Sequence, residues 1–140
     1  MRWLMAVLLG FVLSTGVQAA SIEARLIRAS NVDDKPDQQL SKIEPKLKKV
    51  FGYRHYEQLG IRTAPLKEKE TLRLDLGEGI VILITPKAVE KKERIMDFEM
   101  YSGRASFVKF TLRVSHDRET LIRGPEVGST LLVVSVVMVE

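Results

Sequence analysis

The chain has 140 residues and contains no cysteine, two histidines and a single tryptophan. Without cysteine it can form no disulfide, and it lacks the residue to which bacterial lipoproteins attach their lipid. Aromatic residues make up only 6%, which is a poor supply for stacking against sugars. Stability must therefore rest on an apolar core, for which one domain of this length and 45% hydrophobic content suffice.

An excess of charge of one sign is also missing. The formal net charge is +4, which is too small to indicate binding to nucleic acid. We expect no nucleic-acid partner.

Motifs of catalysis are absent as well. The chain has no glycine-rich loop before a helix and no nucleophile motif. The G-x-G of Gly77 and Gly79 lies between two strand patterns, so it predicts a tight turn instead of a dinucleotide site. We expect no catalytic residue, no cofactor and no metal.

The N-terminus has the three-part order of a secretory signal peptide. Arg2 is followed by an apolar run from Trp3 to Leu13 and then by small and polar residues up to Ala20. The run of about 11 residues is shorter than the roughly 20 that a helix needs to cross a bilayer. We predict a signal peptide at 1–19 that is cleaved after Ala19 or one residue later, a single β-rich domain at 20–140, and a periplasmic or secreted location.

Alternation of apolar and polar residues predicts strands through most of the remaining chain. The expected strands are 22–29, 53–59, 72–76, 80–85, 96–100, 108–114, a short edge strand at 120–123, and 130–139. Helical spacing occurs in one place, from Pro45 to Phe51 before Gly52. The charged stretch Pro86–Glu93 is expected to be an exposed connection.

These patterns predict a mainly β fold, namely an antiparallel β-sandwich-like domain with one short N-terminal helix. The valine-rich stretch Thr130–Val139 is apolar at successive positions, which is typical of an interior strand covered on both faces. The predicted core consists of Leu26, Leu47, Leu74, Ile82, Phe98, Phe110, Leu112, Leu132, Val134 and Val136.

Two surface features have residue types that suit binding. His55, Glu57 and His116, or Asp117 beside it, are the residue types of a two-histidine, one-carboxylate metal site. Tyr53 and Tyr56 are the aromatic residues that we expect to be exposed.

A basic surface is predicted around the helix. Lys42, Lys46 and Lys49 have helical spacing and Arg54 follows shortly after. They form a candidate surface for an anionic partner, and they equally suit the solvated face of an amphipathic helix.

The overall layout carries a resemblance. The predicted signal peptide is followed by an opening strand and by a helix that starts at Pro45–Leu47. After the helix come Tyr53 and Tyr56, and Gly124-Pro125 precede an apolar last strand. In this the chain resembles families of short exported bacterial proteins of unknown function. The resemblance implies export and a β-rich fold, and it implies no activity and no site residues.

Taken together, the sequence predicts an exported module of the bacterial envelope that binds or assembles without catalysis, its partner a protein or another envelope component. One alternative is a small secreted inhibitor that presents a loop. The other is a metal-binding enzyme that uses His55, Glu57 and His116.

Overall fold

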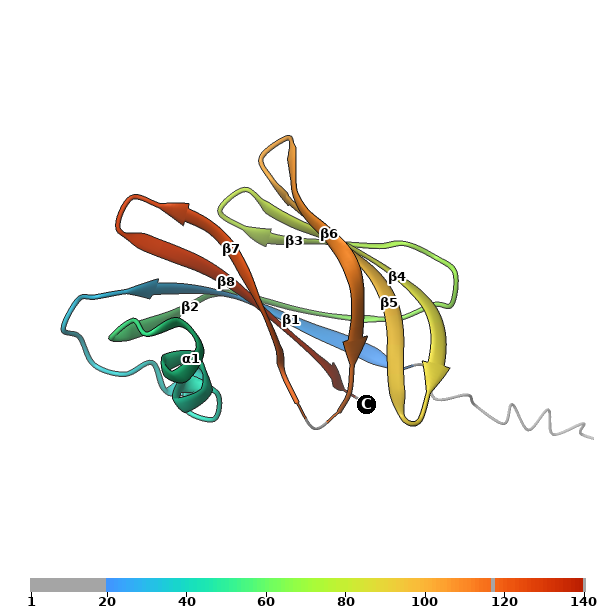
Figure 1. The fold of residues 1–140 in the computed structure, drawn as a ribbon, viewed down its shortest axis with the longest axis horizontal. Helices are drawn as coiled ribbons and strands as arrows, with labels where there is room; N and C mark the ends of the chain where they lie inside the picture. Colours follow the sequence, from blue (N-terminus) through green and yellow to red (C-terminus); the bar gives the residue numbers. More distant parts are fainter. Residues whose placement is uncertain (1–19, 117, 140) are drawn as a thin grey trace, which may run out of the picture.

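The computed structural model describes residues 20–116 and 118–139, which form a β-sandwich with one helix on its outside (Figure 1). The predicted signal peptide at 1–19 lies outside the described residues. The elements in chain order are β1 (Ser21–Ser30), the 3-10 helix η1 (Gln38–Leu40), α1 (Glu44–Phe51), β2 (His55–Pro65), β3 (Leu72–Gly77), β4 (Ile80–Glu90), β5 (Glu93–Ser102), β6 (Ala105–Val114), β7 (Thr120–Val127) and β8 (Thr130–Val139).

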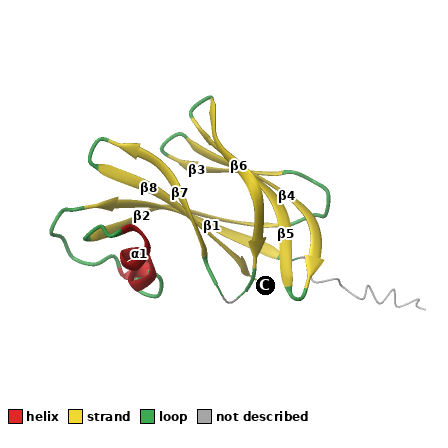
Figure 2. Ribbon diagram, in the orientation of Figure 1, coloured by secondary structure: helices red, strands yellow, loops and turns green. Residues whose placement is uncertain are grey.

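The strands form two antiparallel sheets of four. One sheet has the order β2-β1-β8-β7 and the other has the order β3-β4-β5-β6 (Figure 2). The second sheet is a meander of consecutive strands, whereas the first joins both ends of the described chain. This confirms the predicted sandwich-like fold and the single short helix between the first two strands.

The main core lies between the sheets and consists of alternate residues of the strands. Leu26, Ile82, Phe98 and Val134 are among its fully buried members. Every predicted core residue is buried except Phe110, which is only partly covered and packs against this core from β6.

A second apolar cluster lies on the outer face of the first sheet, under α1. It contains Ile27 of β1, Leu131 and Val133 of β8, Leu47 of α1, and Tyr56 of β2. Leu47 therefore belongs to this layer and not to the centre of the sandwich. Helix formation here follows from the sequence, since Pro45 stands in the first turn and Gly52 ends the helix with φ 75°.

The strand β8 is covered on both faces, as predicted for Thr130–Val139. Val134 and Val136 face the main core, while Leu131 and Val133 lie under the helix. Its neighbours β1 and β7 occupy both edges. This chain alone therefore completes the strand.

The prediction for Pro86–Glu93 was wrong. β4 continues to Glu90 and β5 begins at Glu93, so only Lys91 and Lys92 form the turn, with φ of 47° and 70°. From Lys87 to Lys92 every side chain is exposed. Where both faces of a hairpin meet water, apolar alternation is not required, and the pattern that marks a strand disappears.

Candidate functional site

The three residues of the alternative metal site have separate environments. His55 is buried at the start of β2 opposite Ser30, and His116 is exposed after β6. The Glu57 carboxylate lies 3.7 Å from the Arg28 guanidinium, an ion pair on the adjacent strand. Among residues 20–116 and 118–139 no group of three or more His, Asp or Glu side chains is placed to hold a metal ion. The described structure therefore does not assemble that site, and Asp117 lies outside the described residues.

The expectation that Tyr56 is exposed was wrong. Its side chain is 1% exposed. The hydroxyl donates a hydrogen bond to the Leu47 carbonyl at 2.9 Å and accepts one from the Tyr53 N–H at 3.1 Å. Burial raises the pKa of this phenol above its ordinary value of 10.0. Tyr56 thus attaches α1 to β2 and is a structural residue, not a binding surface.

The four predicted basic residues are all exposed, but only two lie on the helix. Lys42 is in the turn before α1, and Arg54 follows the helix with its guanidinium 3.7 Å from the Asp33 carboxylate. The Lys46 ammonium donates to the Glu119 carbonyl at 2.5 Å. Lys46 therefore also fixes the helix to the β6–β7 connection, and the role in anion binding stays a prediction.

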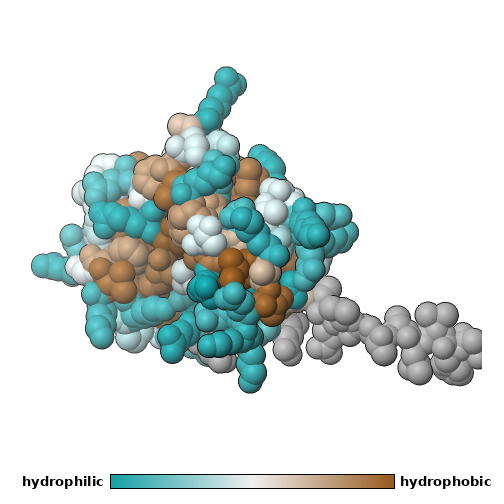
Figure 3. Space-filling model, turned by 45° about the vertical axis from the view of Figure 1, so that its right-hand side comes forward, coloured by the Kyte–Doolittle hydropathy of each residue, from teal (hydrophilic) through white to brown (hydrophobic). Residues whose placement is uncertain are grey.

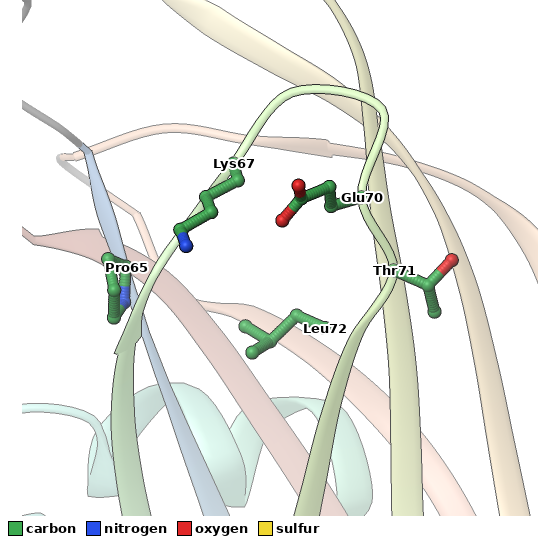
Figure 4. A pocket seen from close by; sticks show the side chains of 5 residues that line it. All are labelled: Pro65, Lys67, Glu70, Thr71 and Leu72. Carbon is green, nitrogen blue, oxygen red and sulfur yellow. The ribbon is translucent and has the colours of Figure 1, made fainter.

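Hollows in the described surface are open and small. One of about 250 Å³ lies at the β2–β3 connection, where Lys67, Glu70 and Leu72 point toward the hollow and Thr71 points away (Figure 4). Another of about 350 Å³ lies beside α1, lined by Lys46, Arg113 and Glu93 among others. Basic and acidic groups are mixed in both, so neither favours a ligand of one charge.

The four edge strands of the two sheets differ in how well they are protected against pairing with another strand. An edge strand leaves backbone N–H and C=O groups unpaired, and natural proteins protect such edges by shortness, proline, bulges or charged side chains. β3 has six residues, and β7 carries Gly124 and Pro125 at a break in its register. β2 has a register break near Leu59 and ends at Pro65. It also packs so closely on β3 that a Cβ on Gly60 would lie 2.5 Å from the Leu76 carbonyl oxygen.

The fourth edge strand, β6, has a bulge and the exposed charges of Lys109 and Arg113, but it is neither short nor interrupted by proline. It has ten residues without glycine or proline, and within the described part of the chain it pairs only with β5. Its register breaks once, at Phe107, and is regular from Val108 to Val114. Hydrogen bonds to the other sheet occur at its C-terminal end, where Thr120 Oγ1 reaches the Arg113 carbonyl at 3.5 Å and Met138 N–H reaches that of Ser115 at 3.1 Å.

Apolar side chains accompany this open edge. Phe107 is 46% exposed, and Val108 and Phe110 are only partly buried, although they project from the core side of β6. The Phe110 ring contacts that of Phe98 with centroids 5.2 Å apart. On the face shown in Figure 3, hydrophobic surface (brown) lies between hydrophilic residues (teal). An unpaired backbone beside partly exposed apolar side chains is the arrangement that an added strand can cover.

The sequence predicts the strand but not its free edge. Val108 to Val114 alternate without a turn residue, which indicates a regular strand, but alternation does not show how many neighbours a strand has.

No protein-family model, no curated protein and no solved structure matches the chain. The resemblance to exported bacterial families therefore stays a prediction. In the described residues no helix is long and apolar enough to span a bilayer.

Proposed function

We propose that this chain is an exported module of the bacterial envelope that works without catalysis and joins a protein partner through the edge of β6. The observation that carries the proposal is the combination on β6 of an unpaired edge with partly exposed Val108 and Phe110. β-strand addition supplies affinity through main-chain hydrogen bonds and specificity through alternate side chains. The small secreted inhibitor stays an alternative prediction.

The export part of this proposal is supported by the residue order of the N-terminal segment, and cleavage there is compatible with the fold. Cleavage after Ala19 leaves all described strands intact. It also keeps the Ala20 carbonyl, which accepts a hydrogen bond from the Leu66 N–H at 2.8 Å. Cleavage one residue later removes that acceptor, and this hydrogen bond is the reason for proposing the first of the two positions.

Export is tested by fractionating the producing cell and sequencing the N-terminus of the recovered protein. We expect the protein in the envelope or outside the cell, beginning at Ala20. A start at Ser21 would correct the cleavage position only, whereas an intact Met1 in the cytosol would contradict export.

The binding part is tested with a photo-crosslinking amino acid placed in the living producer. Lys109 is exposed on β6 and Arg73 is exposed on the short edge strand β3, so the two positions form a matched pair. We expect a defined protein adduct from position 109 and none from position 73. Adducts from neither position, or equally from both, would contradict a partner at β6.

A further inference from the structure

The edge of β6 is complementary in sequence to a second copy of itself. We infer that the partner at this edge is another copy of this chain, bound antiparallel about a two-fold axis at Phe110, so that two four-stranded sheets become one of eight strands. The inference rests on the proposed role of β6 in binding. It goes beyond that role by naming the partner and the register.

The pairing about Phe110 matches residue types along the free part of the strand. Val108 then lies opposite Leu112 of the second copy, Phe110 opposite its own equivalent, and Lys109 opposite Thr111. The apolar residues of this set belong to the core side of β6, and Lys109 and Thr111 are exposed. The core-side apolar row thus continues from one copy into the next, and no like charges lie directly opposite each other.

Other two-fold registers conflict with charge or with bonds already made. An axis at Lys109 places two lysines opposite each other, and an axis at Thr111 places Lys109 opposite Arg113. An axis at Leu112 needs the edge near Arg113 and Ser115, whose carbonyls already accept hydrogen bonds from Thr120 and Met138. An axis at Val108 needs regular pairing through Phe107, where the strand bulges. A register in which one copy is shifted by one residue relative to the other would place side chains of the core side opposite side chains that point outward.

Burial supplies a second reason for self-association. Both copies expose Val108 and Phe110 in part, and the pairing brings these four side chains together on one face of the joined sheet. The paired segment is short, so we expect an association that depends on protein concentration instead of a permanent dimer.

The register is tested by charge. The Thr111 side chain is exposed, and its hydroxyl makes only a long 3.4 Å hydrogen bond with the Asp97 carboxylate, so Thr111→Lys is compatible with the fold. In the dimer, the new lysine at position 111 of each copy lies opposite Lys109 of the other copy, so two pairs of ammonium groups face each other. We expect the dissociation constant to rise by roughly tenfold. Adding Lys109→Glu places opposite charges at both positions and is expected to restore the dimer.

The matched control is Thr63→Lys on β2, an exposed edge-strand threonine opposite Glu23. Sedimentation velocity over a concentration series, on protein purified in the form that the producing cell accumulates, gives the association of all four proteins. Circular dichroism and urea unfolding check that each variant is folded. We expect the wild type, Thr63→Lys and the double variant to dimerise with similar affinity.

A wild type that stays monomeric up to its solubility limit would overturn the inference, as would a dimer that Thr111→Lys leaves unchanged. The crosslinked adduct from position 109 separates this inference from the proposed function. An adduct of twice the chain's mass supports both, whereas an adduct with a different protein keeps a partner at β6 and overturns the second copy.

Discussion

Tyr56 is the residue whose environment differs most from what its type suggests. The sequence shows a tyrosine near a second tyrosine, but the acceptor of its hydroxyl, the Leu47 carbonyl, lies nine positions earlier on a different element. No local pattern reports such a contact, because it exists only after α1 has packed on the sheet. Phe110 shows the converse: alternation correctly assigned it to the core side of its strand, but an edge strand cannot cover that side completely.

Replacing Tyr56 with phenylalanine removes one hydrogen bond donated to Leu47 and one accepted from Tyr53. Because the site is buried, we expect Tyr56→Phe to lower the free energy of unfolding by about 1–3 kcal/mol, measured by urea denaturation. The control is Tyr101→Phe, whose hydroxyl contacts Glu99 on a solvated face, and we expect a change within about 0.5 kcal/mol. Equal losses in both variants would contradict the role given to Tyr56.

The same residue has a consequence for alkaline stability. Burial raises the pKa of Tyr56 in the folded protein above 10.0, its unfolded value. The contribution of Tyr56 to the free energy of unfolding is therefore complete below pH 10.0 and is lost as the pH rises through the pKa of the folded state. The stability difference between wild type and Tyr56→Phe should shrink above that pH, because Tyr101 and all other groups are common to both proteins. A difference that is constant with pH would show that Tyr56 does not titrate differently on folding.

At the scale of elements, α1 is held by one buried side chain more than by its own helical tendency. A helix of eight residues is marginal without tertiary contacts, and Leu47 is its buried member. We expect Leu47→Ala to cost about 2–5 kcal/mol in urea unfolding. Val50→Ala is the control on the same helix, since Val50 is 56% exposed, and it should change stability by less than about 0.5 kcal/mol. A Leu47→Ala loss as small as that of the control would mean that the helix does not depend on this contact.

The sequence predicted elements that bury at least one face, and it failed where a strand meets water on both faces. Pro45, Leu47 and Gly52 sufficed to place the helix, and the valines of β8 predicted an interior strand. The end of β4 was missed because Lys87 to Glu90 meet water on all sides. The free edge of β6 was missed for another reason: hydrogen-bond neighbours are settled by the whole sheet, and Lys109 or Thr111 carries no local sign of what lies beside it.

For the whole molecule, the two apolar layers share the same two central strands. In β1, Leu26 faces the main core, and Ile27 faces the helix layer, which is the second apolar cluster together with α1. In β8, Val134 and Val133 do the same. Detaching the helix layer would expose Ile27, Leu131 and Val133, at about 1.5–3 kcal/mol for each side chain. That sum is comparable with the entire stability of a small domain, which is roughly 5–15 kcal/mol. We therefore expect the helix layer and the sandwich to unfold together.

Coincident unfolding transitions test this coupling. Two of the three tyrosines, Tyr53 and Tyr56, belong to the helix layer, so tyrosine fluorescence reports mainly on that layer. Far-ultraviolet circular dichroism reports mainly on the strands. We expect one urea midpoint from both signals. In Tyr56→Phe, Tyr53 still reports on the helix layer, and both midpoints should shift together to lower urea. A fluorescence change that precedes the loss of strand signal would show instead that α1 is a separate unit resting on a sandwich that is stable without it.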